Sequence, residues 1–375
     1  MKNKNETILF LGTSRIQIPA IQSAKNLNYK IIGVDKNKFS SGKKLCDYFF
    51  NFDSNNIDLI YKKIKKIKNI KIVSIWANND ILLISKSLLE KKLKIKSLNI
   101  STSKIKLLLN KSKFKSFIKN SPLVIKETGK YKFPIIAKLS KGSGSRGIKL
   151  IYNNNQLKKV DQKKFVFENY IKNGNEYGIN FYRTKKKIFH LPGVKRFFYH
   201  KITFSPLGTM TNKKIRNINT INRLLIDIIK KLKLYGQIKF DLIINSNIPK
   251  IFELSPRFHG EIDTTHLFNY TNSNLAKFYF ERLSNNNLPA KFKKNINNYG
   301  YVCIYNDKVS KKIILKYFKK FDLKFKKLLK RDNYTKKKIS LPLSTNDIFS
   351  YAFFETKNYL SKSKFIKLSK HINRF

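Results

Sequence analysis

The sequence predicts an α/β domain at the N-terminus, followed by a region of α+β construction. Over roughly the first hundred residues, short apolar runs alternate with segments of helical spacing, which is typical of a parallel sheet with crossover helices. After residue 130, strand-like runs and helical runs are grouped instead of alternating. At 375 residues, the chain is long enough for two or three domains.

The N-terminal elements are defined by their apolar patterns. The strand runs are Thr7–Leu11, Lys30–Val34 and Ile70–Trp76, and the helical runs are Gln17–Leu27 and Ile81–Lys92. Two polar segments, Gly12–Arg15 and Asn78–Asp80, follow strands and lie at the edge where open α/β sheets bind ligands. For any single residue of these two segments, we favour a structural role in a strand-to-helix turn over a role in ligand binding.

The middle of the chain changes character. Residues 101–120 have the spacing of a basic amphipathic helix, and short strands follow from Tyr131 to Arg183. Ile218–Leu232 predicts another helix, and strands and a helix continue in a Lys-rich tail after Leu288.

The stretch Lys239–Leu254, KFDLIINSNIPKIFEL, predicts a β-hairpin around the turn-forming cluster Asn245–Asn247. If the register is symmetric about Asn247, Asp241 lies directly opposite Glu253. The expected faces are Asp241, Ile243, Ile251 and Glu253 on one side, and Leu242, Ile244, Phe252 and Leu254 on the other.

Opposed cross-strand carboxylates lie roughly 5 Å apart and repel each other. A divalent cation would relieve the repulsion between Asp241 and Glu253, and oxygen-only ligands favour a hard ion such as Mg²⁺. The alternative is a solvent-facing pair that tolerates modest repulsion. The hairpin by itself does not decide between the two.

A glycine-rich loop lies within Phe133–Ile151, which reads FPIIAKLSKGSGSRGIKLI. Glycines allow backbone N–H groups to approach phosphate oxygens closely, and Lys138 adds a positive charge. Because the loop leads into a strand, it predicts a hairpin flap and not a P-loop. A further strand follows in Phe165–Tyr177, FVFENYIKNGNEY, which carries Glu168 and Glu176.

These features occur in a defined order along the chain. The set is Lys111, Lys138, the glycine loop, Glu168–Ile171, Glu176, Asp241, Glu253 and Ser255–Arg257. In this order and spacing the chain resembles the ATP-grasp superfamily over roughly residues 5–290. It is most similar to the branch of biotin carboxylase, carbamoyl-phosphate synthetase and the phosphoribosylaminoimidazole carboxylating enzyme.

The resemblance implies a domain organisation and a role for each residue. It implies a Rossmann-like domain over 1–100, an ATP-grasp domain over 101–290 with its flap at about 130–190, and a small β-rich domain over 291–375. The implied ATP-binding residues are Lys111, Lys138, Gly142, Ser143, Gly144, Ser145, Arg146, Gly147, Glu168, Asn169, Tyr170, Ile171 and Glu176. The implied ligands of Mg²⁺ or Mn²⁺ are Asp241, Glu253 and Ser255, and the implied catalytic residues are Lys138 and Arg257.

The implied reaction is an ATP-dependent ligation. ATP phosphorylates a small-molecule carboxylate to an acyl phosphate, and an amine or similar nucleophile displaces the phosphate. Two magnesium ions would bridge phosphate oxygens, and flap closure would exclude water. The basic-aromatic segment Gly193–His200 is a candidate for binding an acidic substrate through Lys195, Arg196 and His200.

One departure from the family pattern supports an alternative. The family usually has E-x-N-P-R, and here Ser255 stands where a metal-ligating Asn is expected. A hydroxyl is a weaker ligand than an amide carbonyl. A non-catalytic ATP-binding homologue is therefore the first alternative to a ligase.

Composition bears on partners and location. The formal charge of +58 suggests nucleic acid, but Lys greatly outnumbers Arg and is spread along the whole chain. Nucleic-acid readers rely on Arg forks, so we expect no specific nucleic acid and keep a basic nucleic-acid-binding protein as the last alternative. Two distant cysteines indicate a reducing cytoplasm, and no apolar run is long enough to span a membrane. A homodimer is compatible with the sequence.

Overall fold

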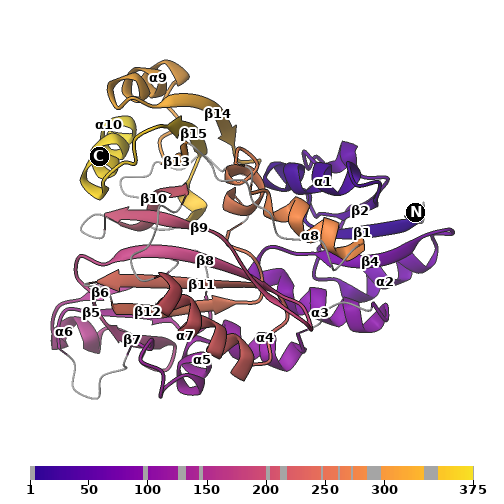
Figure 1. The fold of residues 1–375 in the computed structure, drawn as a ribbon, viewed down its shortest axis with the longest axis horizontal. Coiled ribbons are helices and arrows are strands. Elements are labelled where there is room, and N and C mark those ends of the chain that lie inside the picture. Colours follow the sequence, from indigo (N-terminus) through magenta and orange to yellow (C-terminus); the bar gives the residue numbers. More distant parts are fainter. Residues whose placement is uncertain are drawn as a thin grey trace.

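The computed structural model describes residues 5–95, 100–125, 132–142, 147–199, 203–211, 218–245, 248–260, 262–271, 273–284, 297–332 and 345–374. Its strands form three sheets of four, eight and three strands. Figure 1 shows the N-terminal sheet on one side of the molecule, the other two sheets on the opposite side, and the C-terminal helices at one corner.

The four-stranded sheet is parallel, with the order β3-β2-β1-β4. Its strands are β1 (Glu6–Leu11), β2 (Lys30–Val34), β3 (Tyr48–Phe50) and β4 (Lys71–Trp76). The helices of this region are α1 (Ile18–Lys25), α2 (Ile57–Lys65) and α3 (Leu83–Lys92). The predicted α/β construction is confirmed, and the sequence had not indicated β3 or α2. Asn56 starts α2, because its side chain accepts a hydrogen bond from Leu59 N at 3.1 Å.

The three-stranded sheet carries the glycine-rich loop. It is antiparallel with the order β6-β5-β7, and two helices precede it in the chain. The elements are α4 (Thr102–Leu109), α5 (Lys111–Phe117), β5 (Ile135–Leu139), β6 (Lys149–Ile151), α6 (Asn154–Lys158) and β7 (Phe165–Asn169). Of the loop, Ser143, Gly144, Ser145 and Arg146 lie outside the described residues.

The prediction of a single helix over residues 101–120 was wrong, because the helix is interrupted at Asn110. Asn110 has an extended backbone (φ −97°, ψ 108°), and its side chain accepts a hydrogen bond from Lys113 N at 3.1 Å. An Asn side chain in this position caps a new helix, so α5 starts at Lys111.

The eight-stranded sheet is antiparallel throughout and has the order β12-β11-β8-β9-β10-β13-β15-β14. Its strands are β8 (Asn175–Arg183), β9 (Ile188–Tyr199), β10 (Thr203–Thr211), β11 (Gly236–Asn245), β12 (Ile248–Ser255), β13 (Asn298–Ile304), β14 (Lys324–Lys330) and β15 (Ser350–Thr356). The helices are α7 (Ile218–Lys231), α8 (Leu275–Ser284), α9 (Lys311–Lys320) and α10 (Lys362–Asn373). The C-terminal strands therefore continue the central sheet.

Helix α8 fixes the N-terminal sheet to the rest of the molecule. Phe280 packs among Phe10 and Trp76 in one buried cluster. Tyr29 Oη donates to the Phe280 carbonyl at 3.1 Å, and Tyr279 Oη is 2.7 Å from Ser74 Oγ. These buried contacts join segments more than 200 residues apart, and they place the carboxyl edge of the parallel sheet next to the central sheet.

The predicted hairpin is β11 and β12, and Asp241 is paired with Glu253 as expected. The register shifts between Asp241 and Leu242, so Leu242 pairs with Ile251. The expected face of Ile251 and Phe252 was wrong for this reason. The extra residue reverses the alternation, which sends Ile251 into the core and leaves Phe252 facing a cavity. Ser246 and Asn247 of the turn lie outside the described residues.

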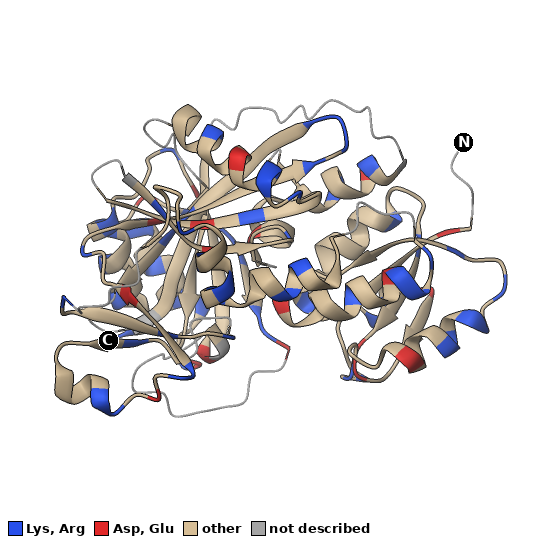
Figure 2. Ribbon diagram, turned by 90° about the horizontal axis from the view of Figure 1, so that it is seen from below, with Lys and Arg blue, Asp and Glu red and all other residues tan. Residues whose placement is uncertain are grey.

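Positive charge is dispersed over the molecule. Figure 2 shows Lys and Arg on helices and strands of every part that the structure describes, and they do not form a single stripe. Within the described part of the chain, no helix is both long and apolar enough to cross a bilayer.

Candidate active site

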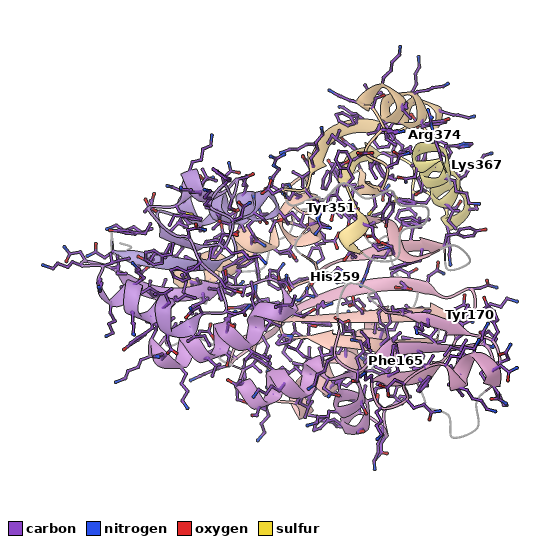
Figure 3. All side chains as sticks on the ribbon, turned by 180° about the vertical axis from the view of Figure 1, so that it is seen from behind. Phe165, Tyr170, His259, Tyr351, Lys367 and Arg374 are labelled. Atoms are coloured by element: carbon purple, nitrogen blue, oxygen red, sulfur yellow. The ribbon has the colours of Figure 1, made fainter. Side chains whose placement is uncertain are left out.

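A cavity of about 420 Å³ lies between the three-stranded sheet, the central sheet and the carboxyl edge of the N-terminal sheet. Figure 3 shows Tyr170 toward the three-stranded sheet, and His259 and Tyr351 nearer the middle of the molecule. The predicted site residues that line the cavity are Lys111, Lys138, Gly142, Glu168, Asn169, Tyr170, Ile171, Glu176, Asp241, Glu253 and Arg257. Segments from three sheets thus converge on one space, whose volume is that of an ordinary ligand site.

The opposed carboxylates on the hairpin share a buried lysine. Lys239 Nζ is 2.7 Å from Asp241 Oδ2 and 2.8 Å from Glu253 Oε1. Lys239 and Asp241 share a face of β11 because side chains alternate along a strand. Burial by itself raises the pKa of Glu253, but the charge of Lys239 outweighs this effect and lowers it to about 2. Both carboxylates are therefore ionised, and an ammonium group relieves their repulsion.

Asp241 has further partners on its other oxygen. Arg196, on β9, forms an ion pair with Asp241 Oδ1, and His259 Nδ1 lies 3.4 Å from the same oxygen. Burial opposes ionisation, but Arg196 and Lys239 lower the pKa of Asp241 below its usual value. Arg196 was predicted within a segment that enters the cleft. It lines the cavity from strand β9. Lys195 is not among the residues that line the cavity, and His200 is outside the described residues.

Arg257 is held by Asp80, which lies at the carboxyl edge of the N-terminal sheet. Arg257 Nε donates to Asp80 Oδ1 at 2.7 Å, and Nη2 donates to Oδ2 at 2.6 Å. The sequence placed Asp80 at the ligand-binding edge of the sheet but favoured turn chemistry for it. Its position after a strand at the ligand-binding edge was the available signal. This two-point ion pair fixes the guanidinium at the cavity wall and joins the two sheets.

A second buried cluster lies at the other end of the cavity. Glu168 on β7 pairs with Lys138 at 2.9 Å and with Lys115, which is 4% exposed. Burial raises the pKa of Glu168, but the two lysines together lower it below its usual value. Lys138 Nζ also lies 4.9 Å from the centre of the Phe252 ring. The sequence predicted roles for Lys138 and Glu168 but not for Lys115, because the place of Lys115 on a helix gave no sign of a partner 53 residues away.

The glycine loop and its neighbour Lys111 are linked directly. Lys111 Nζ donates to the Gly142 carbonyl at 2.6 Å, and Lys111 N donates to the Ser140 carbonyl at 3.0 Å. The start of α5 is therefore tied to the start of the loop, where a lysine and backbone groups meet.

His259 and Asp263 lie beside the carboxylate pair, toward the C-terminal strands. A Cβ on Gly178 would lie 2.1 Å from the His259 ring, so the ring needs glycine at this position of β8. Burial lowers the pKa of His259 well below its usual value and raises the pKa of Asp263 to about 7. Within the described residues, Asp263 Oδ1 is buried and has no hydrogen-bond partner. A π-helical turn, Asp263–Leu267, presents this carboxyl group, and such turns are frequent at functional sites.

The C-terminal strands complete this end of the cavity. Tyr301 and Cys303 from β13, Arg331 after β14, and Ile348 and Tyr351 near β15 line it. This end therefore combines apolar and aromatic walls with an arginine and the Asp263 carboxyl group.

The hairpin provides oxygen ligands of the type that Mg²⁺ prefers, but few of them. Ser255 is 1% exposed, and its Oγ donates to Glu253 Oε1 at 3.3 Å. Within the described residues, there is no group of three or more His, Cys, Asp or Glu that could hold a metal ion. Any metal at this site would need oxygens from a ligand as well as from Glu253 and Asp241.

A family model for an ATP-grasp domain matches residues 104–261. No curated protein matches the sequence. The fold is similar to that of L-amino acid ligase from Bacillus licheniformis, with a TM-score of 0.76, 11% identity, and coverage of 99% of this chain and 98% of that one.

Two further solved structures have the same fold. N5-carboxyaminoimidazole synthetase from Staphylococcus aureus, complexed with ADP, has a TM-score of 0.74 at 14% identity, and the match covers 99% of this chain and 98% of that one. The biotin carboxylase domain of 2-oxoglutarate carboxylase from Hydrogenobacter thermophilus, in complex with MgADP and bicarbonate, has a TM-score of 0.69 at 14% identity, with coverage of 93% and 86%. Residues 104–261 therefore match the ATP-grasp domain family, and the chain as a whole has the ATP-grasp fold.

Proposed function

We propose that this chain is an ATP-dependent ligase, which activates a carboxylate as an acyl phosphate for attack by an amine or a similar nucleophile. The observation that supports the proposal most strongly is the single cavity that runs from the Lys138–Glu168 pair to the Asp241–Glu253 pair. The residues of both pairs lie within the segment that matches an ATP-grasp domain. Two solved structures with this fold contain ADP. One of these is named a synthetase, and a third structure with the fold is named a ligase.

In the proposed arrangement, the purine lies near Glu168 and the backbone of Tyr170 and Ile171. The triphosphate extends past Lys111 and Lys138 toward Glu253. Glu176 faces the same cavity and is assigned to the ribose hydroxyls. Lysines and loop N–H groups offset phosphate charge, which phosphoryl transfer requires more than covalent assistance.

The first step joins the substrate carboxylate to the γ-phosphorus. One carboxylate oxygen forms a bond to phosphorus while the bond from phosphorus to the bridging oxygen breaks, which releases ADP. Mg²⁺, held by Glu253 and phosphate oxygens, would offset charge on the transferred group. Arg257, fixed by Asp80, lies on the wall beside these carboxylates and is positioned to stabilise the developing negative charge.

The second step uses the C-terminal end of the cavity. The amine nitrogen forms a bond to the carbonyl carbon, phosphate leaves, and the nitrogen loses a proton. Asp263 is the candidate acceptor for that proton, because its free oxygen is buried in the cavity and its pKa of about 7 suits a base at neutral pH. The apolar and aromatic walls near Tyr351 and Ile348 favour substrates with an apolar portion.

The proposal is tested first by nucleotide binding and then by turnover. A non-hydrolysable ATP analogue with Mg²⁺ should bind, giving heat in calorimetry and a higher melting temperature. Pairs drawn from a panel of carboxylates and amines should then be screened for release of ADP. No binding of the nucleotide at saturating concentration would contradict the proposal.

A non-catalytic ATP-binding protein is the second candidate. Ser255 in place of the usual Asn and the occupation of the carboxylate pair by Lys239 both favour it. Tight nucleotide binding, without ADP release in the presence of any carboxylate and amine pair, would support this candidate over the ligase.

A further inference from the structure

The carboxylate pair of the hairpin contains its own cation. The Lys239 ammonium group lies between Asp241 Oδ2 and Glu253 Oε1, at 2.7 and 2.8 Å, and Lys239 is 4% exposed. These distances are those of charge-assisted hydrogen bonds to both carboxylates at once. Lys239 therefore occupies the position between the two side chains where a bridging divalent ion would otherwise relieve their repulsion.

The remaining oxygens of the pair are not equivalent. Asp241 Oδ1 is paired with Arg196, so both oxygens of Asp241 face protein cations. Glu253 differs, because Lys239 and Ser255 both donate to its Oε1. Its side chain is 24% exposed, and no residue in the described ranges donates a hydrogen bond to Oε2. Glu253 Oε2 is thus the one oxygen of the pair that remains open to a ligand in the cavity.

The charge balance of the surrounding cluster leads to the same conclusion. Three carboxylates, those of Asp80, Asp241 and Glu253, are matched one for one by Lys239, Arg196 and Arg257. Two divalent ions would add four positive charges to a cluster that is already neutral. The phosphates of a nucleotide would offset part of this charge, but the hairpin offers no unpaired carboxylate for a second ion.

We propose that Lys239 serves as a built-in replacement for one metal ion, so that a nucleotide binds here with a single divalent cation coordinated by Glu253 Oε2. This inference rests on the proposed function for the identity of the ligand. The ammonium group has three N–H donors and uses two on the carboxylates. The third is available to a phosphate oxygen, which lets Lys239 bridge protein and phosphate as a metal ion would.

The first experiment counts the metal ions. Mn²⁺ binding is measured by electron paramagnetic resonance in the presence of a saturating non-hydrolysable ATP analogue. We expect one Mn²⁺ per wild-type chain and two in Lys239→Met, because removal of the ammonium group leaves the facing carboxylates open to an ion. Two ions per wild-type chain, or one in both proteins, would overturn the inference.

The second experiment needs no nucleotide and thus separates this inference from the proposed function. The melting temperature of wild-type protein should change by less than about 1 °C on addition of Mg²⁺. Lys239→Met should melt lower than wild type without metal, since the carboxylates then repel, and Mg²⁺ should restore at least half of the loss. Equal responses of both proteins to Mg²⁺ would overturn the inference.

A lysine on the partner strand provides the matched control. Lys250 lies on β12 of the same hairpin, and its Nζ donates to the Pro122 carbonyl, away from the carboxylates. Lys250→Met should therefore bind one Mn²⁺ with nucleotide and show no stabilisation by Mg²⁺. If Lys239→Met does not fold, the count in wild-type protein decides: one ion supports the inference and two overturn it. If no nucleotide binds at all, the proposed function fails. The inference about Lys239 is then tested by the melting temperature of wild-type protein alone, and a rise of several degrees on addition of Mg²⁺ would overturn it.

Discussion

The two ends of the cavity neutralise buried charge in different ways. At the end near the three-stranded sheet, one carboxylate, Glu168, is shared by two lysines, which leaves an excess of positive charge. At the hairpin end, one lysine, Lys239, is shared by two carboxylates, and neighbouring arginines bring the cluster to neutrality. The first arrangement suits the attraction of an anion, while the second suits the positioning of groups around a reaction without trapping charge.

Breaking the first cluster should have the largest effect. Glu168→Gln removes the negative charge that pairs with Lys115 and Lys138, and Lys115 is buried. Removing one partner of a buried ion pair costs about 3–5 kcal/mol, so we expect a loss of that size in the free energy of unfolding, measured by urea titration. Lys115→Met is the control, because Glu168 keeps Lys138 and the new side chain is apolar. A loss of less than about 1 kcal/mol in Glu168→Gln would show that the cluster does not stabilise the fold.

The pH dependence of stability should show whether the loss in Glu168→Gln comes from charge. The pKa of Glu168 is lowered in the folded protein, so its contribution to stability is complete above the unfolded value of 4.5 and is lost as pH falls through the lower folded value. The difference in stability between wild type and Glu168→Gln should therefore be constant near neutral pH and shrink below pH 4.5. A difference that persists unchanged into acid would assign the loss to packing and not to charge.

The hairpin cluster should respond in activity more than in stability. Glu253→Gln keeps the shape of the side chain and leaves Lys239 paired with Asp241. We expect ADP release to fall by about 100- to 1,000-fold, because the group that would hold the metal loses its charge. The melting temperature should change little compared with Glu168→Gln. ADP release at the wild-type rate would remove Glu253 from the proposed mechanism.

Local patterns in the sequence predicted the hairpin, the parallel sheet and the glycine loop, because each depends on residues near one another in the chain. The pairing of Asp241 with Glu253 followed from the turn position alone. The register shift beyond that pair could not be predicted from the turn position, because a bulge depends on packing by neighbouring strands. It reversed the faces assigned to Ile251 and Phe252.

The charged partners were harder to predict than the carboxylates themselves. Asp80 and Arg257 are 177 residues apart, and only the docking of two sheets brings them together. Lys239 could have been identified, because a lysine two positions before Asp241 must share its strand face. The sequence-based prediction instead assigned the cation between the carboxylates to Mg²⁺ from solution.

The smallest expected effect is a difference in nucleotide affinity between variants of the two lysines assigned to the phosphates. Lys138 is fixed by Glu168 at 2.9 Å, whereas Lys111 is bonded to a backbone carbonyl of the loop, at Gly142. A fixed cation loses less conformational freedom when a ligand binds, so Lys138→Ala should weaken binding of a non-hydrolysable ATP analogue by about 10- to 30-fold. Lys111→Ala should weaken it by about 3- to 5-fold, measured by the same calorimetric titration. Equal losses would mean that anchoring by Glu168 does not contribute to nucleotide affinity, and an unchanged affinity in Lys138→Ala would contradict the placement of the phosphates.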